Sequence, residues 1–354
     1  MLYRENGQFK STYASDQQML PILQDRAFMA ALLVFAFGVV PAMVSDYVFL
    51  SLLIPFLILT LAAIGLNLLV GYCGQISIGH AAFMAVGAYA AYNLALRVPQ
   101  LNFLVVLVLA GLIAAAVGIL FGIPSLRIKG LYLAVATLAA QFFIDWLFAR
   151  VKWFTNYAGS GSVQTAPIEM LGWTVDTPAE KYIFLLSVLI AFTLIAKNLV
   201  RGHIGREWMA IRDMDVAAEV IGIRPVYAKL TAFAVSSFYC GVAGALWGFV
   251  HLGAWEPLAF SLTLSLNLLF MIIIGGMGSL LGSYFGAAFI VVLPILLNQV
   301  PQWLGIPIST SMASHLEFMI FGALIVFFLI VEPNGLARLW AIGKEKLRLW
   351  PFPH

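Results

Sequence analysis

The sequence predicts an all-α, polytopic membrane protein with about ten transmembrane helices, some of them short or broken. Of its 354 residues, 62% are hydrophobic and only 10% are charged, whereas soluble domains carry about 25% charged residues. One fifty-residue stretch, 47–96, contains no Asp, Glu, Lys or Arg. Because a soluble fold needs a wettable surface, so large a deficit of polar residues indicates a surface that faces lipid.

The individual spans follow from charge-free stretches of the length that a bilayer requires. A helix needs about 20 mostly apolar residues to cross it, so the runs 47–96 and 257–316 are each expected to fold back at their glycine clusters. Kinks are expected at Pro55 and Pro294, where a backbone donor is missing. The expected spans lie near 27–45, 48–70, 75–95, 101–123, 130–149, 181–199, 230–250, 262–278, 280–298 and 315–332.

Charge divides the chain into a tail (1–26), a transmembrane domain (27–332) that contains a charged segment (201–229), and a second tail (333–354). The polar first 26 residues do not have the order of a signal peptide, so the first apolar segment is expected to be a retained helix. Short connections rich in Arg and Lys face the cytoplasm. Because such residues gather in 124–129, 201–229 and 333–354, both termini are predicted to be cytoplasmic.

Several function classes receive little support. A net charge of +3 is too small to indicate nucleic-acid binding. Cys73 and Cys240 lie in apolar segments and do not suggest a disulfide framework, and the scattered histidines predict no metal site. A stand-alone secondary transporter would show more embedded acids than Asp145, for which an ion pair with Arg150 or Lys152 is expected. An integral-membrane enzyme would need a buried catalytic cluster, and none is predicted.

The ten residues GYCGQISIGH (71–80) place glycines and polar groups inside the long apolar run. Two interpretations stay open for the four polar residues in or beside it. A broken helix could line a translocation path, or the side chains could bond neighbouring helices together, as small and polar residues do in membranes. The candidate path residues are Asn67, Gln75, Ser77 and His80.

An internal echo points to the same region. The sequence Leu-Asn-Leu-Leu occurs at 66–69 and again at 266–269, each time before a glycine cluster. Paired Gly-interrupted apolar segments are typical of transporters built from repeats. A chance match in a Leu-rich chain is the alternative.

The segment 201–229 holds nine of the thirty-five Asp, Glu, Lys and Arg residues. Its apolar residues recur at helical spacing, but Asp215 interrupts their face, so a helix, a turn near 213–215 and a second short helix are expected. Gly222 suits the position after the second helix, and Pro225 prevents its continuation. The segment could dock on a partner protein or lie as a solvated loop on lipid headgroups.

Four stretches resemble the permeases of branched-chain amino acid ABC importers: GLNLLVGYCGQISIGHAAFMAVGAYAAY (65–92), SLRIKGLYLAVATLA (125–139), a long segment at 205–246, and IGGMGSLLGSYFGA (274–287). The second is similar to the LivM-type subunit rather than to its LivH-type partner. The resemblance implies a permease subunit of an ATP-driven importer for branched-chain or other hydrophobic amino acids, in the bacterial inner membrane. An outer loop (154–161) departs from the family pattern, so import of urea, short amides or aromatic acids is the alternative.

The resemblance also implies partners: a LivH-type sister permease, two ABC ATPase subunits that bind ATP and Mg²⁺, and a periplasmic solute-binding protein. The chain has no GxxxxGK[ST] phosphate loop, so it is expected to bind no cofactor and to be no enzyme. By resemblance, 205–246 contains the loop that docks on the ATPase. Its implied coupling residues are Arg206, Glu207, Arg212, Asp213, Asp215, Ala217, Ala218, Glu219 and Gly222.

Overall fold

The computed structural model describes residue 12 and residues 23–126, 130–158, 161–165, 168–170, 173–303, 310–331 and 335–349. Four predictions therefore fall wholly or partly outside the described residues: the tails 1–26 and 333–354, the basic loop 124–129 and the outer loop 154–161. Eight helical segments of the described residues are long and apolar enough to cross a membrane: 25–43, 46–72, 103–122, 132–150, 178–201, 225–252, 257–275 and 280–297.

Two further helices, α6 (His80–Arg97) and α14 (Thr310–Val331), fall where the remaining two spans were expected. The predicted all-α, multi-pass membrane fold is thereby confirmed, with about ten spans. The other helices of the bundle are α7 (Phe103–Gly122), η4 (Ile123–Leu126), α8 (Leu131–Arg150), α9 (Pro178–Arg201), α11 (Pro225–Leu246), η5 (Trp247–Leu252), η6 (Pro257–Phe260), α12 (Leu262–Gly275) and α13 (Leu280–Trp303).

The first two spans are broken into pieces by π-helical turns. These pieces are α2 (Leu23–Val34), η1 (Phe35–Val39), α3 (Val40–Met43), α4 (Asp46–Val48), η2 (Phe49–Leu53), α5 (Ile54–Asn67) and η3 (Leu68–Tyr72). Pro41 and Pro55 each follow one of the π turns closely. A proline ring would clash with the carbonyl four residues earlier, and the wider turn gives it room. The irregularity expected at Pro55 is thus a π turn just before it.

Helices α5 and α11 form the centre of the bundle. Nearly every residue of α5 is buried, and α11 packs against α5, α6 and α7. Glycines allow this close approach: a side chain at Gly87 of α6 would overlap the backbone of Gly241, and one at Gly244 would overlap that of Met84. Small residues at such contacts let membrane helices pack tightly without a hydrophobic driving force.

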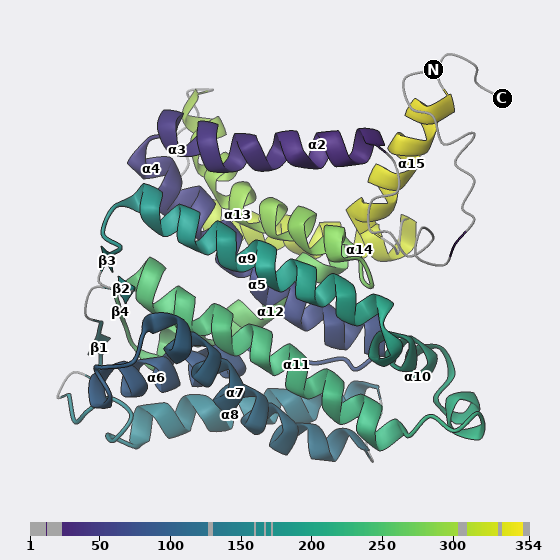
Figure 1. Cartoon of the computed structure of the whole chain (residues 1–354), viewed down its shortest axis with the longest axis horizontal. Coiled ribbons are helices and arrows are strands. Elements are labelled where there is room, and N and C mark those ends of the chain that lie inside the picture. Colours follow the sequence, from purple (N-terminus) through teal and green to yellow (C-terminus); the bar gives the residue numbers. More distant parts are fainter. Residues whose placement is uncertain are drawn as a thin grey trace.

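The two ends of the bundle carry different structures (Figure 1). One end, here called the strand end, carries two short antiparallel pairs: β1 (Val163–Gln164) with β4 (Ala254–Trp255), and β2 (Glu169–Met170) with β3 (Trp173–Thr174). The opposite end, called the α10 end, carries α10 (His203–Val220) and α15 (Gly335–Leu349).

The helix α15 lies within the predicted C-terminal tail, 333–354. It packs against α12 and α13, and Lys344 Nζ lies 3.2 Å from Asp25 Oδ1 near the start of α2. The start of α2, α10 and α15 therefore share one end of the bundle.

Candidate functional site

The polar segment 71–80 is the predicted fold-back between two spans. Helical structure ends at Cys73, residues 74–79 are non-helical, and α6 begins at His80. A broken helix leaves backbone N–H and C=O groups without intrahelical partners. The contacts of this segment show how the chain satisfies them.

The first set of contacts joins the two glycine clusters. Asn67 Nδ2 donates to the carbonyl of Ser279 (2.8 Å) and to Ser283 Oγ (2.9 Å), and Asn67 Oδ1 accepts from the backbone N–H of Gly278 (2.9 Å). Gly71 approaches Gly278 so closely that a side chain at Gly71 would overlap it. We call this contact of Asn67 and Gly71 with residues 278–283 the glycine junction.

The second set surrounds His80, which is completely buried. Its Nδ1 lies 2.7 Å from Ser77 Oγ and its Nε2 lies 2.8 Å from Ser236 Oγ on α11. Both ring nitrogens thus have a hydroxyl partner, in either tautomer. The ring links the non-helical segment to the central helix α11.

Side chains of two other helices cap the start of α6. The N–H of Ala81 donates to Ser265 Oγ of α12, and that of Ala82 donates to Gln141 Oε1 of α8, both at 2.8 Å. Gln141 Nε2 in turn donates to Asp145 Oδ1 at 3.0 Å. The contact seen for Asp145 is therefore with Gln141, not with the Arg150 or Lys152 expected from sequence.

The four candidate path residues fall into two groups. Asn67, Ser77 and His80 are at most 1% exposed and are bonded within the chain, as residues that hold helices together are. Gln75 is only partly buried. Of the four, Gln75 is the one left open to the surroundings of this chain.

The charged segment 201–229 has the predicted helix–turn–helix form. Helix α10 contains a break at Met214 (φ −161°, ψ 97°). Its second part ends at Gly222, whose φ of +93° suits glycine. The N–H groups of Ile223 and Gly222 bond to the carbonyls of Ala218 and Glu219, both at 3.0 Å, which is the Schellman termination of a helix.

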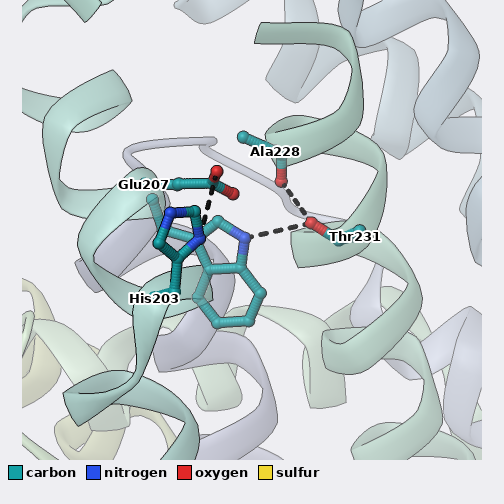
Figure 2. A network of polar contacts seen from close by, with 5 residues as sticks. His203, Glu207, Ala228 and Thr231 are labelled. Atoms are coloured by element: carbon teal, nitrogen blue, oxygen red, sulfur yellow. Dashed lines mark hydrogen bonds and ion pairs between the residues drawn. The ribbon is translucent and has the colours of Figure 1, made fainter. Parts of the chain in front are cut away.

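Buried contacts attach α10 to the membrane helices. Trp208 is fully buried, and its Nε1 donates to Thr231 Oγ1 of α11 at 3.2 Å. Figure 2 shows Thr231 bonded onward to the Ala228 carbonyl, with His203 and Glu207 paired beside it. The His203–Glu207 distance is 3.3 Å. The first part of α10 is thus fixed to α11.

The other predicted coupling residues divide by exposure. Ala218 is buried against its own chain, and Glu207 and Asp215 are partly buried, with Asp215 Oδ2 lying 4.0 Å from Lys229 Nζ. Arg212 donates from Nη1 to the carbonyl of Gly71 at 3.0 Å. The exposed residues of the set, besides Arg212, are Arg206, Asp213, Ala217, Glu219 and Gly222.

Around the break, α10 also exposes large apolar side chains. Their exposed fractions lie between 64% and 83%. We call this set the apolar face of α10; it consists of Met214, Val216, Val220 and Ile221.

Sequence analysis missed several residues that hold these contacts. Gln141 and Ser265, which cap α6, are polar residues inside apolar spans, and that signal could have found them. Trp208 is one of the apolar residues at helical spacing in 201–229, but that spacing did not identify it as the anchor on Thr231. Among the described residues, no three His, Cys, Asp or Glu side chains come together in a group that could hold a metal ion.

Comparison with known proteins gives consistent matches over most of the chain. Residues 48–329 match the family described as "Branched-chain amino acid transport system / permease component". The high-affinity branched-chain amino acid transport system permease proteins LivM of Salmonella typhimurium and Escherichia coli are each 30% identical to the chain, over 89% of it and 75% of their own length.

The match extends to an archaeon. A probable branched-chain amino acid transport permease protein LivM of Methanocaldococcus jannaschii is 24% identical over 65% of the chain and 66% of its own length. No solved structure matches the chain significantly. The family match spans the fold-back segment, α10 and the glycine junction, so the chain belongs to the family of branched-chain amino acid transport permeases.

Proposed function

We propose that the chain is the LivM-type permease subunit of an ATP-driven importer for branched-chain or other hydrophobic amino acids, in the bacterial inner membrane. It pairs with a LivH-type sister permease. Two ABC ATPase subunits bind and hydrolyse ATP with Mg²⁺ at the α10 end, which faces the cytoplasm. A periplasmic solute-binding protein delivers substrate at the strand end.

The observation that carries this proposal is the apolar face of α10. Four large apolar side chains stand exposed in a segment with nine charged residues, and exposed apolar patches of this kind mark interaction surfaces. The hydrogen bond from Trp208 to Thr231 attaches the segment to α11. A fixed, short, kinked helix with an exposed apolar tip is suited to dock in a groove of a partner.

Charge around this face suits recognition. Arg206, Asp213 and Glu219 are exposed on the same element. Exposed charges at an interface contribute mainly to partner choice and register. They would fix how the ATPase seats on the permease.

The mechanism is alternating access. ATP binding closes the ATPases, α10 transmits that motion to the spans, and the binding protein biases the same two-state element from the other side. Transport requires a path, and Gln75 is our candidate for its lining because its side chain is partly exposed.

The test uses the full complex reconstituted in lipid vesicles together with the binding protein. Both uptake and ATP hydrolysis are measured. Val220→Glu places a charge on the apolar face of α10 and is expected to abolish substrate-stimulated ATP hydrolysis. Val220→Leu keeps an apolar side chain and is the matched control, expected to behave as the parent. Normal stimulation in Val220→Glu would contradict docking by this face and favour a loop lying on lipid headgroups.

The departing outer loop (154–161) makes the substrate a separate question. Binding of leucine, urea, short amides and aromatic acids to the purified solute-binding protein would identify it. Binding of leucine, isoleucine or valine supports the proposed substrate. Binding of urea or an amide instead would change the proposed substrate, and the proposed role as a permease subunit would stand.

A further inference from the structure

Arg212 is exposed over about a third of its side chain (37%), but its guanidinium also reaches the membrane helices. The family resemblance implies that it flanks the ATPase, but its Nη1 donates to the Gly71 carbonyl at 3.0 Å. A Cβ placed on Gly278 would lie 3.4 Å from the same nitrogen. Arg212 of α10 therefore meets both members of the glycine junction, although they lie more than 200 residues apart in the sequence.

The chemistry of this contact is that of a helix C-terminus. Gly71 lies in the last turn of η3, where carbonyl groups lack partners and carry partial negative charge. The N–H groups of Gly74 and Gln75 already bond to the carbonyls of Val70 and Leu69. The planar, permanently charged guanidinium of Arg212 is well suited to the next carbonyl, that of Gly71.

The glycines in this region leave room for Arg212. Gly74 has a φ of +71°, and a Cβ placed there would lie 3.0 Å from Cγ and 3.4 Å from Cβ of Arg212. The side chain is also held from its own helix, because Asp213 Oδ1 lies 2.8 Å from Nη2 and accepts from Nε at 2.9 Å. The guanidinium is thus oriented from two sides.

This contact joins elements that no other part of the proposed mechanism links. Trp208 and Lys229 connect α10 to α11, whereas Arg212 connects it to the end of the α5 span. Through Asn67 that end is bonded to residues 278–283 at the start of α13. A displacement of α10 therefore has a bonded route to both glycine clusters.

We propose that Arg212 is a positioning residue that ties α10 to the glycine junction, so that the two move as one body during transport. This rests on the proposed function, because it assigns the route by which motion of the ATPase reaches the spans. The tie acts through a backbone carbonyl, so it requires the bond and not merely the positive charge.

The first experiment removes the bond. Arg212→Met keeps the length of the side chain but donates no hydrogen bond, and it is measured in the full complex in vesicles. ATPase subunits should still co-purify and hydrolyse ATP within about two-fold of the parent, whereas uptake per ATP should fall at least ten-fold. Arg224→Met, which removes an exposed charge of the same segment, is the matched control and should leave this ratio unchanged.

The second experiment replaces the bond with a covalent tie that carries no charge. In a chain with Cys73→Ala and Cys240→Ala, the pair Gly74→Cys and Arg212→Cys places two Cβ positions 3.4 Å apart, at the short limit of disulfide geometry and with a strained φ of +71° at residue 74. With reductant, uptake per ATP should match Arg212→Met. With oxidant, the disulfide should form and restore at least half of the uptake per ATP of the Cys-free chain.

Three results would overturn the tie. The first is unchanged uptake per ATP in Arg212→Met. The second is loss of ATPase subunits from that variant, which would mean that Arg212 contributes to binding the ATPase. The third is a disulfide that lowers uptake or does not form, which means that the contact opens during the cycle or is absent. Absence of ATP-dependent uptake by the unsubstituted complex contradicts the proposed function instead, and disulfide formation between Gly74→Cys and Arg212→Cys still tests the contact.

Discussion

Replacing Asn67 by Leu should destabilise the chain far more than it changes transport by the molecules that fold. Asn67 is completely buried, and its side chain makes three hydrogen bonds at 2.8–2.9 Å to residues 278–283. Leu has the same branched shape but is the larger side chain, so the change leaves no cavity and adds some overpacking. The change removes the bonds that close the glycine junction.

The magnitude follows from those three bonds. Side-chain hydrogen bonds between membrane helices average about 0.6 kcal/mol and reach about 1.7 kcal/mol. Loss of three of them should lower the free energy of unfolding by about 2–5 kcal/mol. Asn267 is the matched control from the echo sequence: it is partly buried and no hydrogen bond of its side chain is seen in the described residues. Asn267→Leu should shift stability by no more than about 0.5 kcal/mol.

The assay has two readouts. Reversible unfolding of the purified chain in mixed micelles gives the free energy of unfolding, and uptake normalised to assembled complex gives activity per folded molecule. The reasoning is refuted if Asn67→Leu is as stable as Asn267→Leu but transports poorly. Asn67 would then line the path rather than hold helices together.

Four further variants are tested by stability, uptake, accumulation in membranes or proteolysis. His80→Ala removes two buried hydrogen bonds and leaves a cavity, so it should cost about 3 kcal/mol of stability, whereas Gln75→Ala should leave the melting temperature unchanged and reduce uptake. Gly244→Leu would overlap the Met84 backbone, so the chain should fail to accumulate in membranes, as immunoblotting would show. Gly222→Ala places a side chain at a φ of +93°, which should cost about 1 kcal/mol and speed proteolysis in 201–229.

Much of the fold could be predicted from composition and length alone. The bilayer fixes how many apolar residues a span needs, so the fold-back inside 47–96 followed directly, and a helix lies at each expected span. The π turns before Pro41 and Pro55 could not be placed in the same way. Hydropathy reports whether a segment is apolar, and a π turn is as apolar as the α-helix around it.

The candidate site could be predicted only in its local parts. The turn within 201–229 and the termination at Gly222 depend on neighbouring residues, and both were found in the structure. The burial of Ala218 and the bond of Arg212 to the membrane helices depend on what lies behind α10. The partner of Arg212, the carbonyl of Gly71, is 141 residues away, and no local spacing encodes such a contact.

The glycine junction also bears on the internal echo. A two-fold repeat would make reciprocal contacts, so that Asn67 would meet the second glycine cluster while Asn267 met the first. Asn67 does bond to residues 278–283, but no hydrogen bond of the Asn267 side chain is seen in the described residues. The place facing the first cluster is taken instead by Arg212 of α10, against Gly71 and Gly74. The two clusters are therefore not equivalent at this contact. The first is bonded directly to α10 through Arg212, whereas the second is bonded to Asn67 at the end of the α5 span.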